Sequence, residues 1–274
     1  MPELPEVETI ATNLRNGTPD QPPIRGMVID TGTVLWARSL AAPTLDEFVL
    51  RLPGQVVEEI WRRGKYLVLN LSQDYLLFHL RMSGDLLVER QESPLAAHHR
   101  LLIDFQNGYR LAFNDTRKFG RAWLVPDPES VLSRLGPEPL GAEFSATDLY
   151  QRLHAFHRQL KPLLLDQRFL AGLGNIYTDE ALHKAGLHPL KISDEVNEDQ
   201  AKKLWQSVRE VLQEGIRHNG ASIDWVYRGG DFQNHFRVYQ RGGEPCPNCG
   251  TPIERIVVGQ RGTHFCPYCQ PRLM

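Results

Sequence analysis

The chain has 274 residues, of which 41% are hydrophobic and 23% are charged, and its formal net charge is −2 at pH 7. These values are ordinary for a globular protein and leave room for two domains with sizeable cores. No apolar run approaches the length of a bilayer span, and Glu3, Glu6 and Glu8 exclude a secretory signal, so we expect a cytoplasmic protein.

The N-terminal segment carries the first candidate for chemistry. If Met1 is removed, Pro2 has a secondary amine, which can attack a carbon and form an iminium without a cofactor. Glu3 places a carboxylate beside it. Taken alone, the pair also fits a common second residue next to a solvated glutamate. Apolar residues from Val7 to Leu14 then recur at helical spacing until Asn16-Gly17, which predicts a short helix.

Residues 26 to 125 consist of short apolar runs that are often β-branched. Turn signals such as Pro53-Gly54, Ser83-Gly84 and Asn107-Gly108 separate them. Short strands at this spacing predict an antiparallel β-sandwich, which together with the leading helix forms an N-terminal domain over residues 1–130.

Prolines and glycines at 126–141 predict the link between two domains. Beyond it, Ser145 and Asp148 have the spacing of a capping box. Apolar residues at helical spacing from Leu149 to Leu160 then predict one helix that continues up to Pro162.

A second helix is expected from Asn175 to Gly186 and a third from about Asn197 to His218. Residues 221–235 contain Gly229-Gly230 and show no period, which predicts a loop. These elements give a helical domain over residues 142–235, and the fold class is α+β.

The four cysteines form two Cys-x-x-Cys pairs with sixteen residues (250–265) between them: Cys246, Cys249, Cys266 and Cys269. This spacing matches a tetrahedral four-thiolate zinc site. Two disulfides are the alternative, but nothing in the sequence indicates an oxidising compartment. We expect one structural Zn²⁺, no organic cofactor, and a zinc-finger hairpin within residues 236–274, with strands near 254–258 and 263–265.

Charge is unevenly distributed along the chain. Basic residues cluster at 62–65, at 117–121 and after Phe236. Local basic patches on a chain that is otherwise acidic fit a protein that binds a polyanion at one surface. Such patches also occur on ordinary solvated faces.

These features together resemble the formamidopyrimidine-DNA glycosylase family of base-excision repair enzymes. Seven segments carry the resemblance in the family's order: 1–9, 63–66, 79–84, 114–120, 161–162, 172–177 and 260–263. It implies a catalytic β-sandwich, a helix-two-turn-helix DNA-binding domain with a lesion-capping loop at 221–235, and a zinc-finger hairpin.

The resemblance implies a role for four catalytic residues. Pro2 attacks C1′ of the damaged nucleotide, and Glu3 moves protons at the sugar. Lys65 and Arg261 match residues that hold the backbone phosphates and assist elimination. The plain alternatives are a surface lysine on a strand edge and an unpartnered arginine at a hairpin tip.

Further positions match the family's DNA contacts. Asn175 is implied to bind phosphate between two helices, or it is a plain N-cap. Met82, Arg117 and Phe119 match side chains that fill the space of an extruded base; without the family pattern, Met82 and Phe119 read as core residues. His79, His98 and Lys161 match additional contacts and equally fit ordinary surface or core positions.

The implied function is removal of oxidised purines, mainly 8-oxoguanine and formamidopyrimidines, from damaged duplex DNA, followed by β,δ-elimination at the abasic site. A monomer suffices for this reaction. One alternative is an endonuclease VIII-type enzyme for oxidised pyrimidines, which Leu4 and Val7 disfavour because that group usually has other residues there. The other alternative is a non-catalytic DNA-binding protein. One departure is Arg81, where many members have glycine, so the backbone beside Met82 is expected to be less free.

Overall fold

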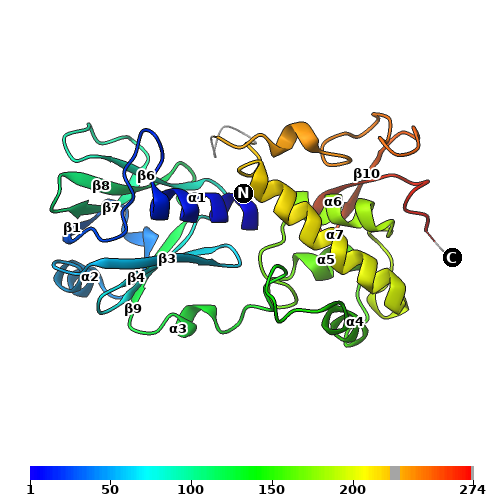
Figure 1. Ribbon diagram of the computed structural model, residues 1–274, viewed down its shortest axis with the longest axis horizontal. Helices are drawn as coiled ribbons and strands as arrows, with labels where there is room; N and C mark the ends of the chain where they lie inside the picture. Colours follow the sequence, from blue (N-terminus) through cyan, green and yellow to red (C-terminus); the bar gives the residue numbers. More distant parts are fainter. Residues whose placement is uncertain (223–228, 273–274) are drawn as a thin grey trace. The chain divides into compact units, whose positions relative to one another are not determined.

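The structure is a computed structural model that describes residues 1–222 and 229–272. The described chain divides into two compact units: residues 1–133 with residues 222 and 229, and residues 134–221 with 230–272 (Figure 1). The middle of the predicted capping loop, residues 223–228, lies outside the described residues. Among the helices that are described, none has the length and apolar character needed to cross a membrane.

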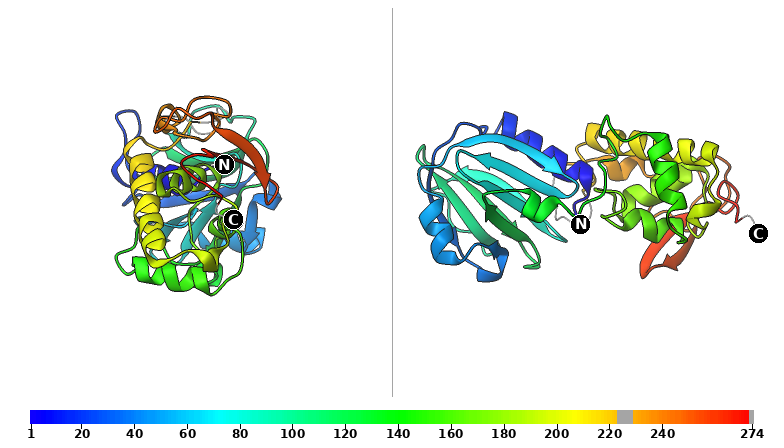
Figure 2. Two further views of the ribbon diagram at one scale, coloured as in Figure 1. Left: turned by 90° about the vertical axis from the view of Figure 1, so that its right-hand side faces the viewer. Right: turned by 90° about the horizontal axis from the view of Figure 1, so that it is seen from below.

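The first unit is a β-sandwich, as the sequence predicted. One sheet has the order β1-β7-β8-β6 and the other β2-β9-β5-β4-β3, and Figures 1 and 2 show them as two layers. All pairings are antiparallel except β2 with β9. The strands are β1 (Ile29–Val34), β2 (Leu40–Ala42), β3 (Val57–Arg63), β4 (Tyr66–Leu71), β5 (Tyr75–His79), β6 (Gly84–Arg90), β7 (His99–Phe105), β8 (Tyr109–Asp115) and β9 (Arg121–Val125). The helical segments are α1 (Leu4–Asn16), η1 (Ala37–Ser39), α2 (Leu45–Arg51) and α3 (Glu129–Leu132).

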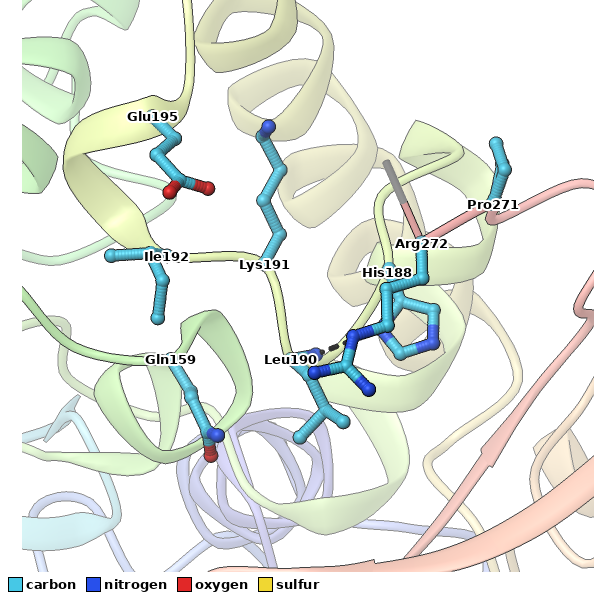
Figure 3. Close-up of a pocket in the computed structure, with 8 residues that line it drawn as sticks. All are labelled: Gln159, His188, Leu190, Lys191, Ile192, Glu195, Pro271 and Arg272. Atoms are coloured by element: carbon cyan, nitrogen blue, oxygen red, sulfur yellow. Dashed lines mark hydrogen bonds between the residues drawn. The ribbon is translucent and has the colours of Figure 1, made fainter. Parts of the chain in front are cut away.

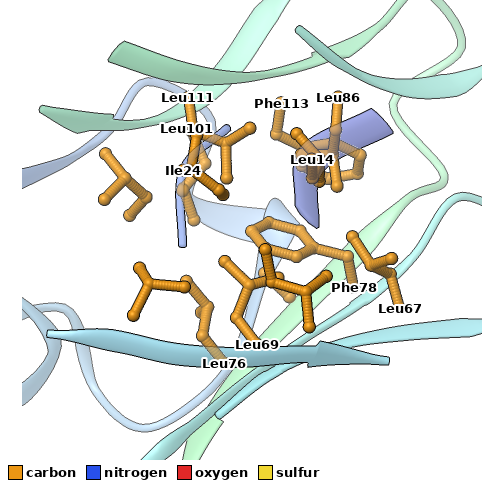
Figure 4. Close-up of a cluster of buried hydrophobic side chains, with 14 of the residues drawn as sticks. Leu14, Ile24, Leu67, Leu69, Leu76, Phe78, Leu86, Leu101, Leu111 and Phe113 are labelled. Atoms are coloured by element: carbon orange, nitrogen blue, oxygen red, sulfur yellow. The ribbon is translucent and has the colours of Figure 1, made fainter. Parts of the chain in front are cut away.

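Apolar side chains from both sheets fill the space between them. Figure 4 shows Leu69, Leu76 and Phe78 of one sheet facing Leu101 and Phe113 of the other. Helix α1 adds its own apolar face to this core and contacts β3 and β4. Burial of this face holds the start of α1, and with it the N-terminal residues, against the sandwich.

The second unit contains the helices and the zinc-finger hairpin. Its elements are α4 (Ala146–His154), α5 (Leu160–Leu165), α6 (Asn175–Ala185), η2 (Ser193–Glu195), α7 (Glu198–Arg217), η3 (Phe232–His235), β10 (Glu254–Val258) and β11 (Arg261–Phe265). The predicted capping box is present, because Ser145 accepts from the Asp148 N–H at the start of α4. Gly186, with a φ of +70°, ends α6 in the left-handed conformation that glycine adopts without steric cost.

The prediction of one helix from Leu149 to Pro162 is wrong. Helix α4 ends at His154, and α5 begins at Leu160. Between them the chain turns at Ala155 and becomes extended at Gln159, which forms a β-bridge with Ile192, and the Leu160 N–H donates to the Lys191 carbonyl at 2.9 Å. This tertiary pairing replaces the helical bonds, and Pro162 falls in the first turn of α5, where no N–H is needed.

Candidate active site and nucleic-acid interface

Pro2 and Glu3 lie at the positive end of α1. Glu3 is the N-cap residue, and its N–H donates to Glu6 Oε2 at 2.7 Å. Pro2 and Glu3 are both buried, whereas Met1 is 40% exposed. The burial and the cap fix the direction in which the Pro2 nitrogen points. With Met1 attached, that nitrogen is an amide, so it could act as a nucleophile only after Met1 is removed.

Lys65 lies in the two-residue turn of the β3–β4 hairpin. Gly64 precedes it with a φ of +56°, which glycine adopts without steric cost. The Lys65 side chain is 5% exposed, so the alternative of a solvated surface lysine is wrong. Arg62, at the end of β3, donates from Nε to Glu8 Oε2 at 2.9 Å and ties this hairpin to α1.

His79, at the end of β5, is a neutral histidine. Its Nδ1 accepts the Arg81 N–H at 3.0 Å, and its ring packs edge-on against Tyr66. Burial, followed by the charges of Arg81 and Lys65, lowers the pKa of His79 to about 3. Since Nδ1 accepts, the proton is assigned to Nε2, and this group can donate to an acceptor but does not carry positive charge.

The lowered pKa of His79 predicts a pH-dependent stability. In the unfolded chain His79 has a pKa of about 6.5, so below that pH the unfolded chain binds a proton that the native chain does not bind. The free energy of unfolding therefore falls as the pH falls towards 3. His79→Asn keeps an acceptor for Arg81 but cannot titrate. Urea unfolding at pH 7 and pH 5 should show the wild type losing about 2 kcal/mol more than the variant. Parallel losses would contradict the assignment.

Met82, Arg117 and Phe119 lie on two loops that Asp115 fastens together. Asp115 is 1% exposed and accepts from the Ser83 hydroxyl, from the Arg117 N–H at 3.1 Å and from the Gly120 N–H at 2.7 Å. Strands β6 and β8 place the loops side by side, because Gly84 pairs with Asp115. Three predicted DNA contacts, one from the loop before β6 and two from the loop after β8, therefore lie at the same end of this strand pair.

The exposure of these side chains fits a wedge and does not fit a core. Phe119 is 51% exposed, and the Arg117 guanidinium lies 5.2 Å from the centre of its ring. Met82 is half-buried. Arg81 has a φ of +55°, a conformation that favours glycine, so the departure seen in the sequence costs backbone strain beside Met82.

Asp115→Ala should damage both stability and excision. It leaves buried donors without an acceptor, at a cost of about 1–3 kcal/mol each where water cannot replace it. Cleavage of lesions in duplex DNA should fall further than cleavage of a single-stranded abasic site, which needs no base extrusion. Asp104→Ala, in the ion pair with Arg110 elsewhere in this sheet, is the matched control. Equal losses for both substrates would contradict the wedge.

His98 is exposed and belongs to the same neighbourhood. Its carbonyl accepts the Asp115 N–H at 2.9 Å, and its Nδ1 lies 3.3 Å from Arg100 Nη2. Arg100 in turn donates from Nε to the Asp115 carbonyl at 2.7 Å. The His98 side chain is placed where a polyanion at the Met82 and Phe119 loops could reach it.

In the second unit, Asn175 and Arg261 are neighbours. Asn175 is the first residue of α6, after the N-cap Gly174, and its Nδ2 donates to the Gly262 carbonyl at 3.0 Å. Asn175 is thus not the N-cap itself, and its amide has a second hydrogen to offer. Arg261 is exposed and begins β11, two residues earlier than the predicted strand. The backbone next to Arg261 thus meets the start of α6, and both a helix N-terminus and an exposed arginine are groups that suit a phosphate.

Lys161 does not lie where a DNA contact requires. Its side chain is fully buried and pairs with Asp179, whose other oxygen accepts the His264 N–H at 3.0 Å. The expectation of a DNA contact rested on a match in the sequence, which carries no information about burial. Lys161 instead joins α5 and α6 to β11.

Lys161→Met should be strongly destabilising, because it leaves Asp179 as a buried charge without its cation. We expect a loss of about 3–5 kcal/mol in the free energy of unfolding, measured with urea. Lys202→Met, at an exposed position of α7, should change it by less than about 0.5 kcal/mol. A stable Lys161→Met protein with weakened DNA binding would restore the original expectation.

The four cysteines form the predicted metal site. Their sulfur atoms all lie within 4.8 Å of one another, with 3.9 Å between Cys246 and Cys269 and 3.5 Å between Cys249 and Cys266. None forms a disulfide, so that alternative is wrong. Four thiolates at about 2.3 Å from one ion would be about 3.8 Å apart, which matches these separations. The residues fit one structural Zn²⁺ that holds the end of the hairpin.

Two acidic residues that the sequence analysis missed fasten the hairpin region to α6. The first is Asp179, described above, and the second is Glu180. Glu180 is fully buried and accepts hydrogen bonds from the N–H groups of Arg237, Val238 and Tyr239 at 2.8–3.1 Å. Burial raises the pKa of Glu180, although these three hydrogen bonds act to lower it. The local sequence of α6 gives no signal for this role, since its partners are about sixty residues away.

A pocket in the second unit lies apart from these residues. Figure 3 shows its lining: Gln159, His188, Leu190, Lys191, Ile192, Glu195, Pro271 and Arg272. The Leu190 N–H donates to His188 Nδ1 at 3.1 Å within it. None of the predicted catalytic or DNA-binding residues lines this pocket, so it gives no support to the predicted site.

Comparisons with known proteins agree with this geometry. Three family descriptions match: formamidopyrimidine-DNA glycosylase N-terminal domain over residues 1–122, its H2TH domain over 135–226, and the zinc finger found in FPG and IleRS over 243–272. The formamidopyrimidine-DNA glycosylase of Chloroflexus aurantiacus is 45% identical, and the match covers 98% of this chain and 98% of that protein. The formamidopyrimidine-DNA glycosylase of Protochlamydia amoebophila is 41% identical, and the match covers 99% of this chain and 100% of that protein.

Solved structures of similar proteins contain damaged DNA. MutM in complex with DNA containing carbocyclic 8-oxo-G is 36% identical, with a TM-score of 0.90 over 99% of this chain and all of the other. The Lactococcus lactis Fpg in complex with DNA containing N7-benzyl-Fapy-dG is 35% identical, with a TM-score of 0.91 over the same shares.

Proposed function

The chain belongs to the formamidopyrimidine-DNA glycosylase family, and we propose on this basis that it excises oxidised purines from duplex DNA and then cleaves the abasic site. Its relatives carry that name, and similar structures hold DNA with 8-oxo-G, Fapy-dG or an abasic site. The partner of this chain is therefore damaged double-stranded DNA, and its metal is the zinc of the four-cysteine site.

One observation in the structure carries the proposal furthest. Asp115 gathers the loops of Met82, Arg117 and Phe119 at one edge of the sandwich, with the aromatic ring exposed. A wedge that replaces an extruded base needs an apolar side chain and a cation on one rigid support. This set also favours a purine enzyme over the pyrimidine type.

The reaction would proceed through Pro2. Its amine attacks C1′, the C1′–N bond breaks, and the base leaves with a proton. The Pro2 nitrogen then uses its electron pair to form an iminium with C1′ as the C1′–O4′ bond breaks, and O4′ takes up a proton to become a hydroxyl. Glu3 is placed to give and take these protons. Abstraction of the proton at C2′ expels the 3′-phosphate, and a second elimination expels the 5′-phosphate. Lys65 and Arg261 would stabilise the phosphate charge that leaves in these steps.

The test uses covalent trapping. The processed protein is incubated with duplexes that carry either 8-oxoguanine or an oxidised pyrimidine, and borohydride is added to reduce the iminium. An adduct that forms faster with 8-oxoguanine supports the proposal. No adduct with either duplex would refute an enzymatic function, and an adduct only with the pyrimidine would indicate the endonuclease VIII type.

A further inference from the structure

Two imidazoles and a carboxylate meet where α7 ends, away from the four cysteines. His218 is the C-cap residue of α7, Asp231 precedes η3, and His235 ends η3. One ligand atom of each lies within 4.8 Å of the others. His218 Nδ1 is 2.8 Å from Asp231 Oδ1, and His235 Nε2 is 3.9 Å from Asp231 Oδ2.

An ordinary ion pair does not account for all three groups. The contact between His218 and Asp231, taken by itself, would be an unremarkable surface pair. His235, however, stacks on His218 with 3.8 Å between ring centres. A pair between His218 and Asp231 leaves His235 without a role, whereas one ion placed between the three ligand atoms would engage all of them. A neutral imidazole is the form that binds a metal ion.

Hydrogen bonds and aromatic packing hold the backbone on both sides of the cluster. The Asp231 N–H donates to the His218 carbonyl and the Phe232 N–H to the Gly220 carbonyl, both at 3.0 Å. Phe232 is fully buried and stacks on Tyr177 with ring centres 5.2 Å apart. The three ligands are thus carried by hydrogen-bonded backbone, and the exposed fractions of the His218, Asp231 and His235 side chains are 29%, 58% and 39%.

We propose that His218, Asp231 and His235 form a second metal site, for one divalent ion of the zinc and nickel class. Two nitrogen ligands and one oxygen ligand suit these ions, which complete their coordination with water. The ion would hold the end of α7 to the segment that follows residue 230. Occupancy would therefore stabilise this unit in proportion to the free metal concentration.

The test is a titration of the zinc-loaded protein with Ni²⁺, followed by calorimetry. The wild type should bind one equivalent, and both His235→Ala and Asp231→Asn should raise the dissociation constant by at least about tenfold. The second variant is nearly isosteric, which separates ligand loss from misfolding. His157→Ala is the matched control. His157 and Asp194 form an exposed pair at 2.9 Å, and among the described residues no third metal-ligating side chain completes a cluster with them.

Cobalt distinguishes the two metal sites. Co²⁺ that displaces zinc from the cysteines gives sulfur-to-metal charge-transfer absorption, whereas Co²⁺ bound to His218, Asp231 and His235 does not. The proposal is overturned if His235→Ala and Asp231→Asn bind Ni²⁺ as the wild type does, if the wild type binds none, or if all bound Co²⁺ shows the thiolate spectrum.

Discussion

A chain that keeps an extension in front of Pro2 is expected to form no borohydride adduct with an abasic duplex and to lose strand cleavage. The extension turns the Pro2 nitrogen into an amide, which has no basic electron pair for attack on C1′. The loss should exceed the factor of about 10²–10⁴ expected when a general acid or base alone is removed. Trapping on a denaturing gel measures it directly.

The matched control is Glu3→Gln in the processed chain. It keeps the amine, so a preformed abasic site should still be trapped, while excision of 8-oxoguanine slows by about 10²–10⁴-fold. Thermal unfolding should be similar for the extended chain, because Met1 is already 40% exposed. An extended chain that still forms the adduct would show that another amine, such as Lys65, is the nucleophile.

Removal of zinc is expected to have the largest thermodynamic effect. Structural zinc sites of this type contribute about 10–16 kcal/mol of apparent binding free energy, most of which is folding free energy of the hairpin. Cys249→Ser, or a strong chelator, should therefore unfold β10 and β11 and abolish the proposed contact of Arg261 with phosphate. Hydrogen exchange should rise in the hairpin amides and stay unchanged in the sandwich.

Asn248→Ala is the control for this experiment, since Asn248 is an exposed neighbour of Cys249 in the same turn and its side chain is not one of the four metal ligands. It should keep both zinc and activity. If zinc-free protein nicks abasic DNA at the full rate, Arg261 has been assigned the wrong role, because its strand would no longer be folded.

Local patterns predicted the parts of the fold that depend on neighbours in sequence. The capping box of Ser145, the glycine end of α6 and the two Cys-x-x-Cys pairs each follow from residues within a few positions of one another. The break after His154 escaped prediction because the competing partner, the Lys191 carbonyl, is distant in sequence.

The candidate site divides in the same way. The four cysteines could be assigned to a metal site from residue type and spacing, and the structure brings them together. The role of Pro2 also follows from residue type and position, and it stays a prediction. The roles of Lys161 and Phe119 do not follow in that way, because burial depends on the tertiary structure: the lysine proved to be buried and the phenylalanine exposed. Asp115 was missed altogether, since an aspartate before a turn is common and its acceptor role appears only when the two loops meet.

The contacts between α6 and β11 have a consequence for how this chain can change in evolution. Asn175 and Asp179 are one helical turn apart and bind Gly262 and His264, two residues apart on the strand. Four helical residues rise about 6 Å and two strand residues about 6.8 Å, so the repeats match. A single-residue insertion or deletion between either pair would break that match, whereas substitutions elsewhere on these elements would not. Lineages should therefore vary in the residues around these positions but keep the spacing.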